Sequence, residues 1–279
     1  MNVEPSQHLR IPAGACDTHA HVIGRPDERP FVADRSYTPR PAPAESYLAV
    51  HEAFGIERGV LVQVSVHGTD NSLMCETLQA HRDRLRGVAV VPAGIADEEL
   101  DRLEAAGVKG VRINLVTRGG GNSLDDLERL AERVAPRGWH VQVYLDGEHL
   151  LLLERRLPAL ATPLVVDHMG NIPASRGINA PEFTALLRML EGGRCWVKLS
   201  GAYRTSVLGP PFTDTIPFAR ALVAAAPERC VWGSDWPHVQ FDERGWSTFD
   251  LVQLLQDWIP DEHLRRRILV ENAAQLYGF

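Results

Sequence analysis

Short apolar runs recur along the chain, and each is separated from the next by a stretch long enough for a helix. Most runs are near-continuous in Val, Ile and Leu, which is typical of parallel strands buried on both faces. Eight such runs lie at residues 14–18, 59–65, 86–91, 110–115, 140–145, 163–167, 195–199 and 230–233. Helical patterns lie between them or after them, including 100–106, 124–135, 181–191, 217–225 and 261–277. The alternation predicts an α/β protein.

Eight strands alternating with helices in 279 residues predict a (β/α)₈ TIM barrel, and we assign residues 1–279 to a single domain. A doubly wound sheet shows the same alternation, but no G-x-G-x-x-G follows the first strand. The last helical pattern begins at Asp261, which is a suitable N-cap residue.

Two long connections follow strands of the predicted barrel. Residues 25–43 are rich in proline, so we expect them to cross the surface as an extended loop and not as a helix. This loop follows the first strand, on the face where barrel enzymes carry their active sites, and we interpret it as a lid. The alternative is an inert surface excursion. Residues 236–249 form a second long loop on the same face.

Composition and charge exclude several classes of protein. The formal net charge of −7 gives no electrostatic reason to bind nucleic acid or an anionic membrane. The N-terminal sequence lacks the apolar core of a signal peptide, and no apolar run approaches the length of a membrane span. The four cysteines are isolated, with no CxxC pair, so we expect reduced thiols in a cytoplasmic protein.

Polar side chains end most of the predicted strands, where a barrel directs them into the mouth of its active site. His19 and His21 form an H-x-H at the end of the first strand, so both imidazoles project to the same side. They are candidates for metal ligands or for donors to a carbonyl oxygen; a structural pair is the alternative. The other strand ends carry Ser65 with His67, Arg112 with Asn114, Tyr144, Asp167 with His168, Lys198 with Ser200, and Asp235.

Asp235 lies between two tryptophans at the end of the last strand. Partial desolvation there would raise the pKa of the carboxyl group, which suits a general base. The alternative is a loop cap. His168 is a candidate carbonyl-orienting or metal-binding residue. The arginines at the same face favour a substrate with two or more carboxylates, because guanidinium binds carboxylate in a bidentate manner; they are Arg112, Arg118 and Arg204.

Several motifs together resemble the amidohydrolase superfamily. They are Asp17-Thr18-His19-Ala20-His21, Asp167-His168-Met169-Gly170, the segment 232–238 (WGSDWPH) and the closing segment 268–279. Within that superfamily, the segments 63–71 (QVSVHGTDN) and 109–114 (KGVRIN) are similar to motifs of its lactonase branch. The resemblance runs from the first strand to the C-terminus.

The resemblance implies a hydrolase that opens the lactone of 2-pyrone-4,6-dicarboxylate to give 4-carboxy-2-hydroxymuconate, in bacterial breakdown of lignin-derived aromatics. By position, Asp235 would deprotonate the attacking water. The catalytic histidines around the lactone carbonyl would be His19, His21 and His168. The residues that hold the ring carboxylates would be Tyr37, Ser65, Arg112, Arg118, Tyr144 and Arg204.

The resemblance implies no cofactor, because the lactonase branch works without a metal. Binuclear amidohydrolases use a bridging Lys or Glu on strand four and a histidine on strand five, where this chain has Arg112 and Tyr144. A single divalent metal at His19, His21, His168 and Asp235 stays open. So do three other activities: an aldaric (sugar-acid) lactone hydrolase or isomerase, a zinc-dependent aromatic acid decarboxylase, and a barrel that only binds acidic ligands. The sequence does not determine the oligomeric state.

Overall fold

The structure is a computed structural model that describes residues 9–119, 122–241 and 245–279. Its eight strands form one sheet in sequence order, and every neighbouring pair is parallel. The strands are β1 (Cys16–Ala20), β2 (Arg58–Val62), β3 (Leu85–Ala89), β4 (Val108–Asn114), β5 (His140–Tyr144), β6 (Leu164–Val166), β7 (Cys195–Leu199) and β8 (Cys230–Trp232). The predicted (β/α)₈ barrel is confirmed, with strand ends that differ from the predicted ranges by a few residues.

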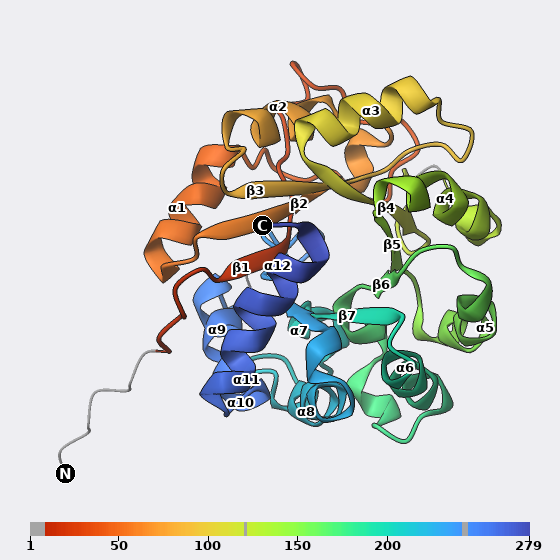
Figure 1. Cartoon of the computed structure of the whole chain (residues 1–279). Helices are drawn as coiled ribbons and strands as arrows, with labels where there is room; N and C mark the ends of the chain where they lie inside the picture. Colours follow the sequence, from red (N-terminus) through yellow and green to blue (C-terminus); the bar gives the residue numbers. More distant parts are fainter. Residues whose placement is uncertain (1–8, 120–121, 242–244) are drawn as a thin grey trace, which may run out of the picture.

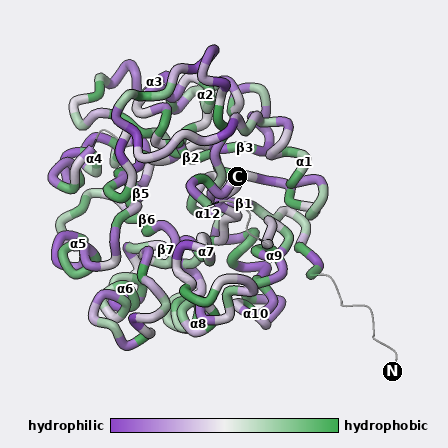
Figure 2. The backbone as a smooth tube through the Cα atoms, turned by 180° about the vertical axis from the view of Figure 1, so that it is seen from behind, coloured by the Kyte–Doolittle hydropathy of each residue, from purple (hydrophilic) through white to green (hydrophobic). Residues whose placement is uncertain are grey.

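Helices surround the strands and present their apolar sides to them (Figure 1). In Figure 2 the helical turns alternate between hydrophobic and hydrophilic residues, as amphipathic helices do. The helices are α1 (Ala44–Phe54), α2 (Ser72–Ala80), α3 (Asp97–Ala106), α4 (Leu127–Val134), α5 (Leu150–Arg156), α6 (Pro181–Glu191), α7 (Ala202–Thr205), α8 (Ile216–Ala225), α9 (Thr248–Gln253), α10 (Leu255–Trp258), α11 (Glu262–Arg266) and α12 (Asn272–Tyr277).

The C-terminal helix closes the amino end of the barrel, and Figure 1 shows α12 across the middle of the ring of strands. Tyr277 packs there with Cys16, Val60 and Val62. The predicted helix at 261–277 is divided, because a π-helical segment separates α11 from α12. Its predicted cap is confirmed: the Asp261 carboxylate accepts hydrogen bonds from the backbone N–H groups of His263 and Leu264 at 2.8 and 2.9 Å.

Residues 25–43 contain no helix, as the prolines predict, and hydrogen bonds join the two ends of this proline-rich loop and fasten its middle to the segment after β2. Ile23 and Ala42 exchange two backbone hydrogen bonds of 2.9 Å, and Val32 N–H donates to the Val66 carbonyl at 2.9 Å. All four cysteines are free thiols. No helix in the described part of the chain is long and apolar enough to span a bilayer. Residues 242–244 of the second long loop lie outside the described residues.

His140 starts β5 at the closed end of the barrel, where its ring meets Tyr277 edge-on with ring centroids 5.3 Å apart. Gly110 on β4 makes room for the ring, since a Cβ there would lie 2.5 Å from His140 Nε2. Burial, reinforced by the charge of Lys198, lowers the pKa of His140 to about 3. The folded protein therefore keeps this imidazole neutral at pH values where the unfolded chain protonates it.

Folding stability should consequently fall as the pH drops below about 6.5, because the unfolded state then binds the proton that the folded state refuses. Between pH 7.5 and pH 5, His140 should lower the free energy of unfolding of the wild type by about 2 kcal/mol. His140→Leu should remove this contribution. Urea unfolding of both proteins at the two pH values measures the difference. Equal losses in the wild type and the variant would contradict the assignment.

Candidate active site

The ends of β1 and β8 are fastened together by hydrogen bonds that place two of the predicted site segments side by side. The buried Asp17 carboxylate accepts from the N–H groups of His19 at 3.1 Å and Ser234 at 2.8 Å. Asp235 N–H donates to the His19 carbonyl, and His21 N–H donates to the Trp236 carbonyl, each at 2.8 Å. These bonds fix the separation between the H-x-H and Asp235.

Gly233 is required for this close approach. A Cβ at position 233 would lie 2.5 Å from the Cβ of His19 and 2.8 Å from its backbone nitrogen. Asp235 itself has a φ of 60°, a left-handed conformation that aspartate tolerates better than most residues. The backbone at Asp235 thus adopts an uncommon conformation, which directs the carboxylate into the barrel.

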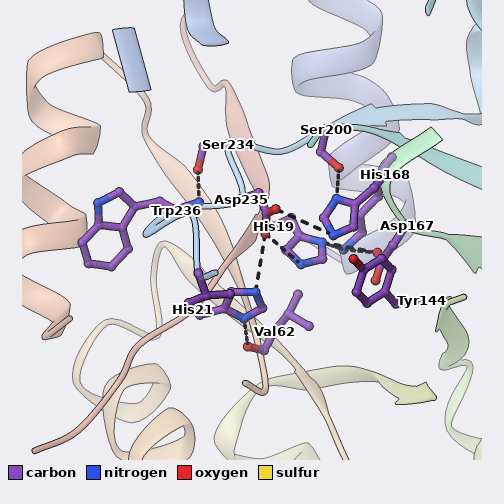
Figure 3. A network of polar contacts seen from close by, with 12 residues as sticks. His19, His21, Val62, Tyr144, Asp167, His168, Ser200, Ser234, Asp235 and Trp236 are labelled. Carbon is purple, nitrogen blue, oxygen red and sulfur yellow. Dashed lines mark hydrogen bonds and ion pairs between the residues drawn. The ribbon is translucent and has the colours of Figure 1, made fainter. Parts of the chain in front are cut away.

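Three imidazole rings face the buried carboxylate of Asp235 (Figure 3). The Nε2 atoms of His19 and His21 lie 3.7 and 3.6 Å from Oδ1, and the Nε2 atom of His168 lies 3.8 Å from Oδ2. The structure therefore brings together all four residues predicted to be catalytic.

His21 and His168 are each oriented by a partner on Nδ1, the ring nitrogen that does not face Asp235. His21 Nδ1 lies 2.7 Å from the Val62 carbonyl, which can only accept, so Nδ1 carries a proton, and in the neutral imidazole Nε2 then presents a lone pair. His168 Nδ1 pairs with Ser200 Oγ at 2.9 Å. Burial lowers the pKa of His168 to about 4 and the pKa of His19 well below its ordinary value, so both rings are neutral near pH 7.

The two oxygens of the Asp235 carboxylate differ in their hydrogen bonds. Oδ2 accepts hydrogen bonds from the Tyr203 hydroxyl at 2.5 Å and from Arg204 Nε at 2.7 Å. Oδ1 has no hydrogen-bond partner among the described residues. One oxygen is thus anchored, while the other faces His19 and His21.

The expected rise in the pKa of Asp235 is wrong. Burial does raise it, but the charge of Arg204 outweighs burial and holds the pKa well below its usual range. Trp236 packs against Tyr47, with ring centroids 5.5 Å apart, and not against the groups that contact the Asp235 carboxylate. Asp235 is therefore ionised near pH 7.

A second buried carboxylate, Asp167, lies beneath the histidines. Its Oδ2 accepts from Arg112 Nε and from Gln142 Nε2, each at 3.0 Å, and its Oδ1 lies 3.3 Å from His19 Nδ1. Lys198 Nζ donates to Gln142 Oε1 at 2.7 Å and lies 3.8 Å from Asp167. Burial raises the pKa of Asp167, but His19, Arg112 and Lys198 hold it well below its usual range.

Above the histidines lies an inner pocket with a free volume of about 10 Å³. Its lining contains seven predicted site residues, namely His21, Tyr37, Ser65, Arg112, Tyr144, His168 and Arg204. Ser65 Oγ and the Tyr37 hydroxyl lie 3.1 Å apart, so the proline-rich loop contributes directly to the pocket wall. The volume admits about one water molecule, so a lactone ring can enter only when side chains move.

Beyond this pocket lies a wider groove of about 750 Å³ between the proline-rich loop and the segment after β8. Residues 37–42 form one side of the groove and residues 237–241 form the other. Tyr37, Val239 and Gln240 line both spaces, so the groove leads into the inner pocket.

Arg118 is the one predicted site residue that lies apart from the others. Its side chain is 70% exposed and forms an ion pair of 3.3 Å with Asp34 of the proline-rich loop. Its role in binding stays a prediction. Conversely, the sequence interpretation did not select Tyr203 or Gln240. The sequence signal for Tyr203 was its position beside Arg204, directly after a strand.

The amidohydrolase family model matches residues 16–279. The chain belongs to the amidohydrolase family. Among curated relatives, the 2-pyrone-4,6-dicarboxylate hydrolase of Comamonas testosteroni is 38% identical, over 96% of this chain and 92% of the relative. The 4-sulfomuconolactone hydrolase of Hydrogenophaga intermedia is 35% identical, over 98% of this chain and 93% of the relative.

A solved structure from Acinetobacter baumannii, described as a probable 2-pyrone-4,6-dicarboxylic acid hydrolase with citric acid bound, gives a TM-score of 0.85. That protein is 30% identical, and the match covers 95% of this chain and all of the other. Because the match covers nearly the whole of both chains at this TM-score, the two proteins share the barrel fold.

The donor atoms of this amidohydrolase fit one divalent ion. His19 Nε2, His21 Nε2 and an Asp235 oxygen lie within 4.8 Å of one another, and both His19 Nε2 and Asp235 Oδ1 lack hydrogen-bond partners among the described residues. An ion held there would polarise a carbonyl oxygen as a Lewis acid. Arg204 already neutralises Asp235, however, and Arg112 with Lys198 neutralises Asp167, so charge balance does not require an added cation.

Proposed function

We propose that this amidohydrolase is a lactonase that hydrolyses 2-pyrone-4,6-dicarboxylate to 4-carboxy-2-hydroxymuconate, without a metal. Lactone hydrolysis is the activity that the two curated relatives described above share by name, at 35–38% identity over nearly the whole chain. The observation that carries the chemical part is the free Oδ1 of an ionised Asp235, which lies 3.6 Å from His21 Nε2.

In the neutral tautomer that the Val62 carbonyl selects, His21 Nε2 presents a lone pair, and a lone pair and a carboxylate at this distance repel each other unless a donor bridges them. A water molecule satisfies both, with one O–H directed to Asp235 Oδ1 and the other to His21 Nε2. Such a water is held beside the floor of the inner pocket, where a lactone carbonyl would arrive. We assign this water as the nucleophile.

In the proposed reaction Asp235 accepts a proton from the water as the oxygen attacks the lactone carbonyl carbon. The carbonyl π electrons move to the oxygen, and His168 Nε2–H, whose proton is kept in place when Ser200 Oγ–H donates to Nδ1, donates to that oxyanion. His19 lies next to His168 and adds a second polar contact to the oxyanion. Collapse of the intermediate breaks the ring C–O bond, and the proton on Asp235 passes to the departing ring oxygen.

The preference for a dicarboxylate rests on the cations around the pocket. Arg112 and Arg204 both line the inner pocket, and both lie over the ring of Tyr144, with guanidinium carbons 5.2 and 5.7 Å from its centroid. Citrate, found in the solved relative from Acinetobacter baumannii, also carries several carboxylates. A sulfomuconolactone is the second candidate substrate, supported by the relative from Hydrogenophaga intermedia.

Replacing Asp235 by asparagine should lower kcat for the pyrone dicarboxylate at least about 100-fold, since general-base contributions are of that order. The amide keeps the size of the side chain but cannot accept the proton. Loss of the pyrone absorbance measures the rate, and circular dichroism checks that the variant is folded. A folded variant with near-wild-type kcat would overturn the role of Asp235 as base.

Arg118 lines neither the inner pocket nor the groove, but it pairs with Asp34 of the proline-rich loop, and we predict that it holds the outer carboxylate of the substrate. Replacing it by alanine should raise KM for the dicarboxylate about 2- to 5-fold, as expected for an exposed ion pair, and should leave KM for a monocarboxylate lactone unchanged. Arg25→Ala is the matched control, because Arg25 is also an exposed arginine paired with an aspartate of the proline-rich loop, Asp27, but is not among the predicted site residues. Equal effects of Arg118→Ala on both substrates would argue against a carboxylate clamp.

A further inference from the structure

Tyr203 contacts the proposed general base more closely than any histidine does. It lies in α7, directly after β7, and its hydroxyl donates to Asp235 Oδ2 at 2.5 Å. The side chain is buried, and burial raises the pKa of the phenol well above its ordinary value, so the hydroxyl keeps its proton.

Aromatic contacts hold the ring of Tyr203 in place from several sides. Trp246 stacks on it with centroids 4.7 Å apart and an interplanar angle of 23°. Phe241 and His238 meet it edge-on at 4.7 and 5.6 Å. A ring held in this way cannot swing its hydroxyl away from Asp235 without disturbing its neighbours.

The two partners of Asp235 Oδ2 differ in their freedom to leave. Arg204 also lines the inner pocket, and a substrate carboxylate entering there offers its guanidinium a new partner. Tyr203 is absent from the lining of that pocket and has no such competitor. When a substrate recruits Arg204, Tyr203 is the donor that remains on Oδ2.

We propose that Tyr203 is the positioning residue of the catalytic base. It fixes the rotation of the Asp235 carboxylate, so that Oδ1 faces the water while Arg204 serves the substrate. This inference rests on the proposed function, which assigns Asp235 as the base. Because Tyr203 acts through Asp235, it should affect the chemical step and not substrate binding.

The test is Tyr203→Phe, which removes the hydroxyl and keeps the ring. We expect kcat for 2-pyrone-4,6-dicarboxylate to fall at least about tenfold, with KM within about twofold of the wild type, the pattern of an interaction that matters in the transition state. Tyr277→Phe is the matched control, because it deletes a buried hydroxyl at the opposite end of the barrel. It should leave kcat within twofold of the wild type.

A double-mutant cycle with Asp235→Asn separates positioning from a general structural effect. If Tyr203 acts through Asp235, Tyr203→Phe should not reduce the residual activity of Asp235→Asn any further. Should Tyr203→Phe fail to fold, Trp246→Phe provides a second variant, since it loosens the stacked ring and keeps the hydroxyl. We expect it to lower kcat by a smaller factor.

Wild-type kcat in folded Tyr203→Phe, or a rise in KM that accounts for the whole loss of efficiency, would overturn this role while leaving the lactonase assignment intact. Independent losses in the double mutant would also overturn it. If Tyr203→Phe does not fold, unchanged kcat in Trp246→Phe has the same consequence. A wild-type enzyme without turnover would instead overturn the proposed function, and the role of Tyr203 with it.

Discussion

The active site depends on a carboxylate, Asp235, that is ionised although it is buried. Desolvating such a charge costs several kcal/mol unless hydrogen bonds and opposite charge compensate for it. Arg204 and Tyr203 supply that compensation on Oδ2. Because they approach from one side, the charge is stabilised without occupying the other oxygen, which stays available to a water molecule. The same contacts keep the pKa of the carboxyl group low, so the base is already deprotonated at neutral pH.

The rest of the site can be understood as support for that arrangement. Asp17 fastens the end of β1 to Ser234, and Gly233 allows the two backbones to approach, so His19 and Asp235 come to the same place. Below them, Asp167 is balanced by Arg112 and Lys198 in a second buried network. The rings of His19 and His168 are neutral above this charged network, so each can accept or donate a hydrogen bond according to its tautomer.

The barrel and most of the site could be predicted from the sequence because both depend on local signals. Near-continuous apolar runs identify strands, and a parallel barrel gathers the polar residue that ends each strand at one face, as with His19, Arg112 and Tyr144. The direction of the Asp235 pKa shift could not be predicted, because it depends on Arg204, 31 residues away, folding back onto the carboxylate. Tyr203 was missed for the same reason, and the exposed position of Arg118 depends on where the proline-rich loop lies.

The most direct test of the account follows the ultraviolet absorbance of 2-pyrone-4,6-dicarboxylate after addition of the enzyme, with and without a strong chelator. The account predicts that the pyrone band disappears at the same rate in both samples, because Asp235 and its neighbours activate water without a metal. Loss of the band only in the absence of chelator would contradict the metal-free mechanism and favour an ion at His19, His21 and Asp235. An unchanged band in both samples would contradict the proposed substrate.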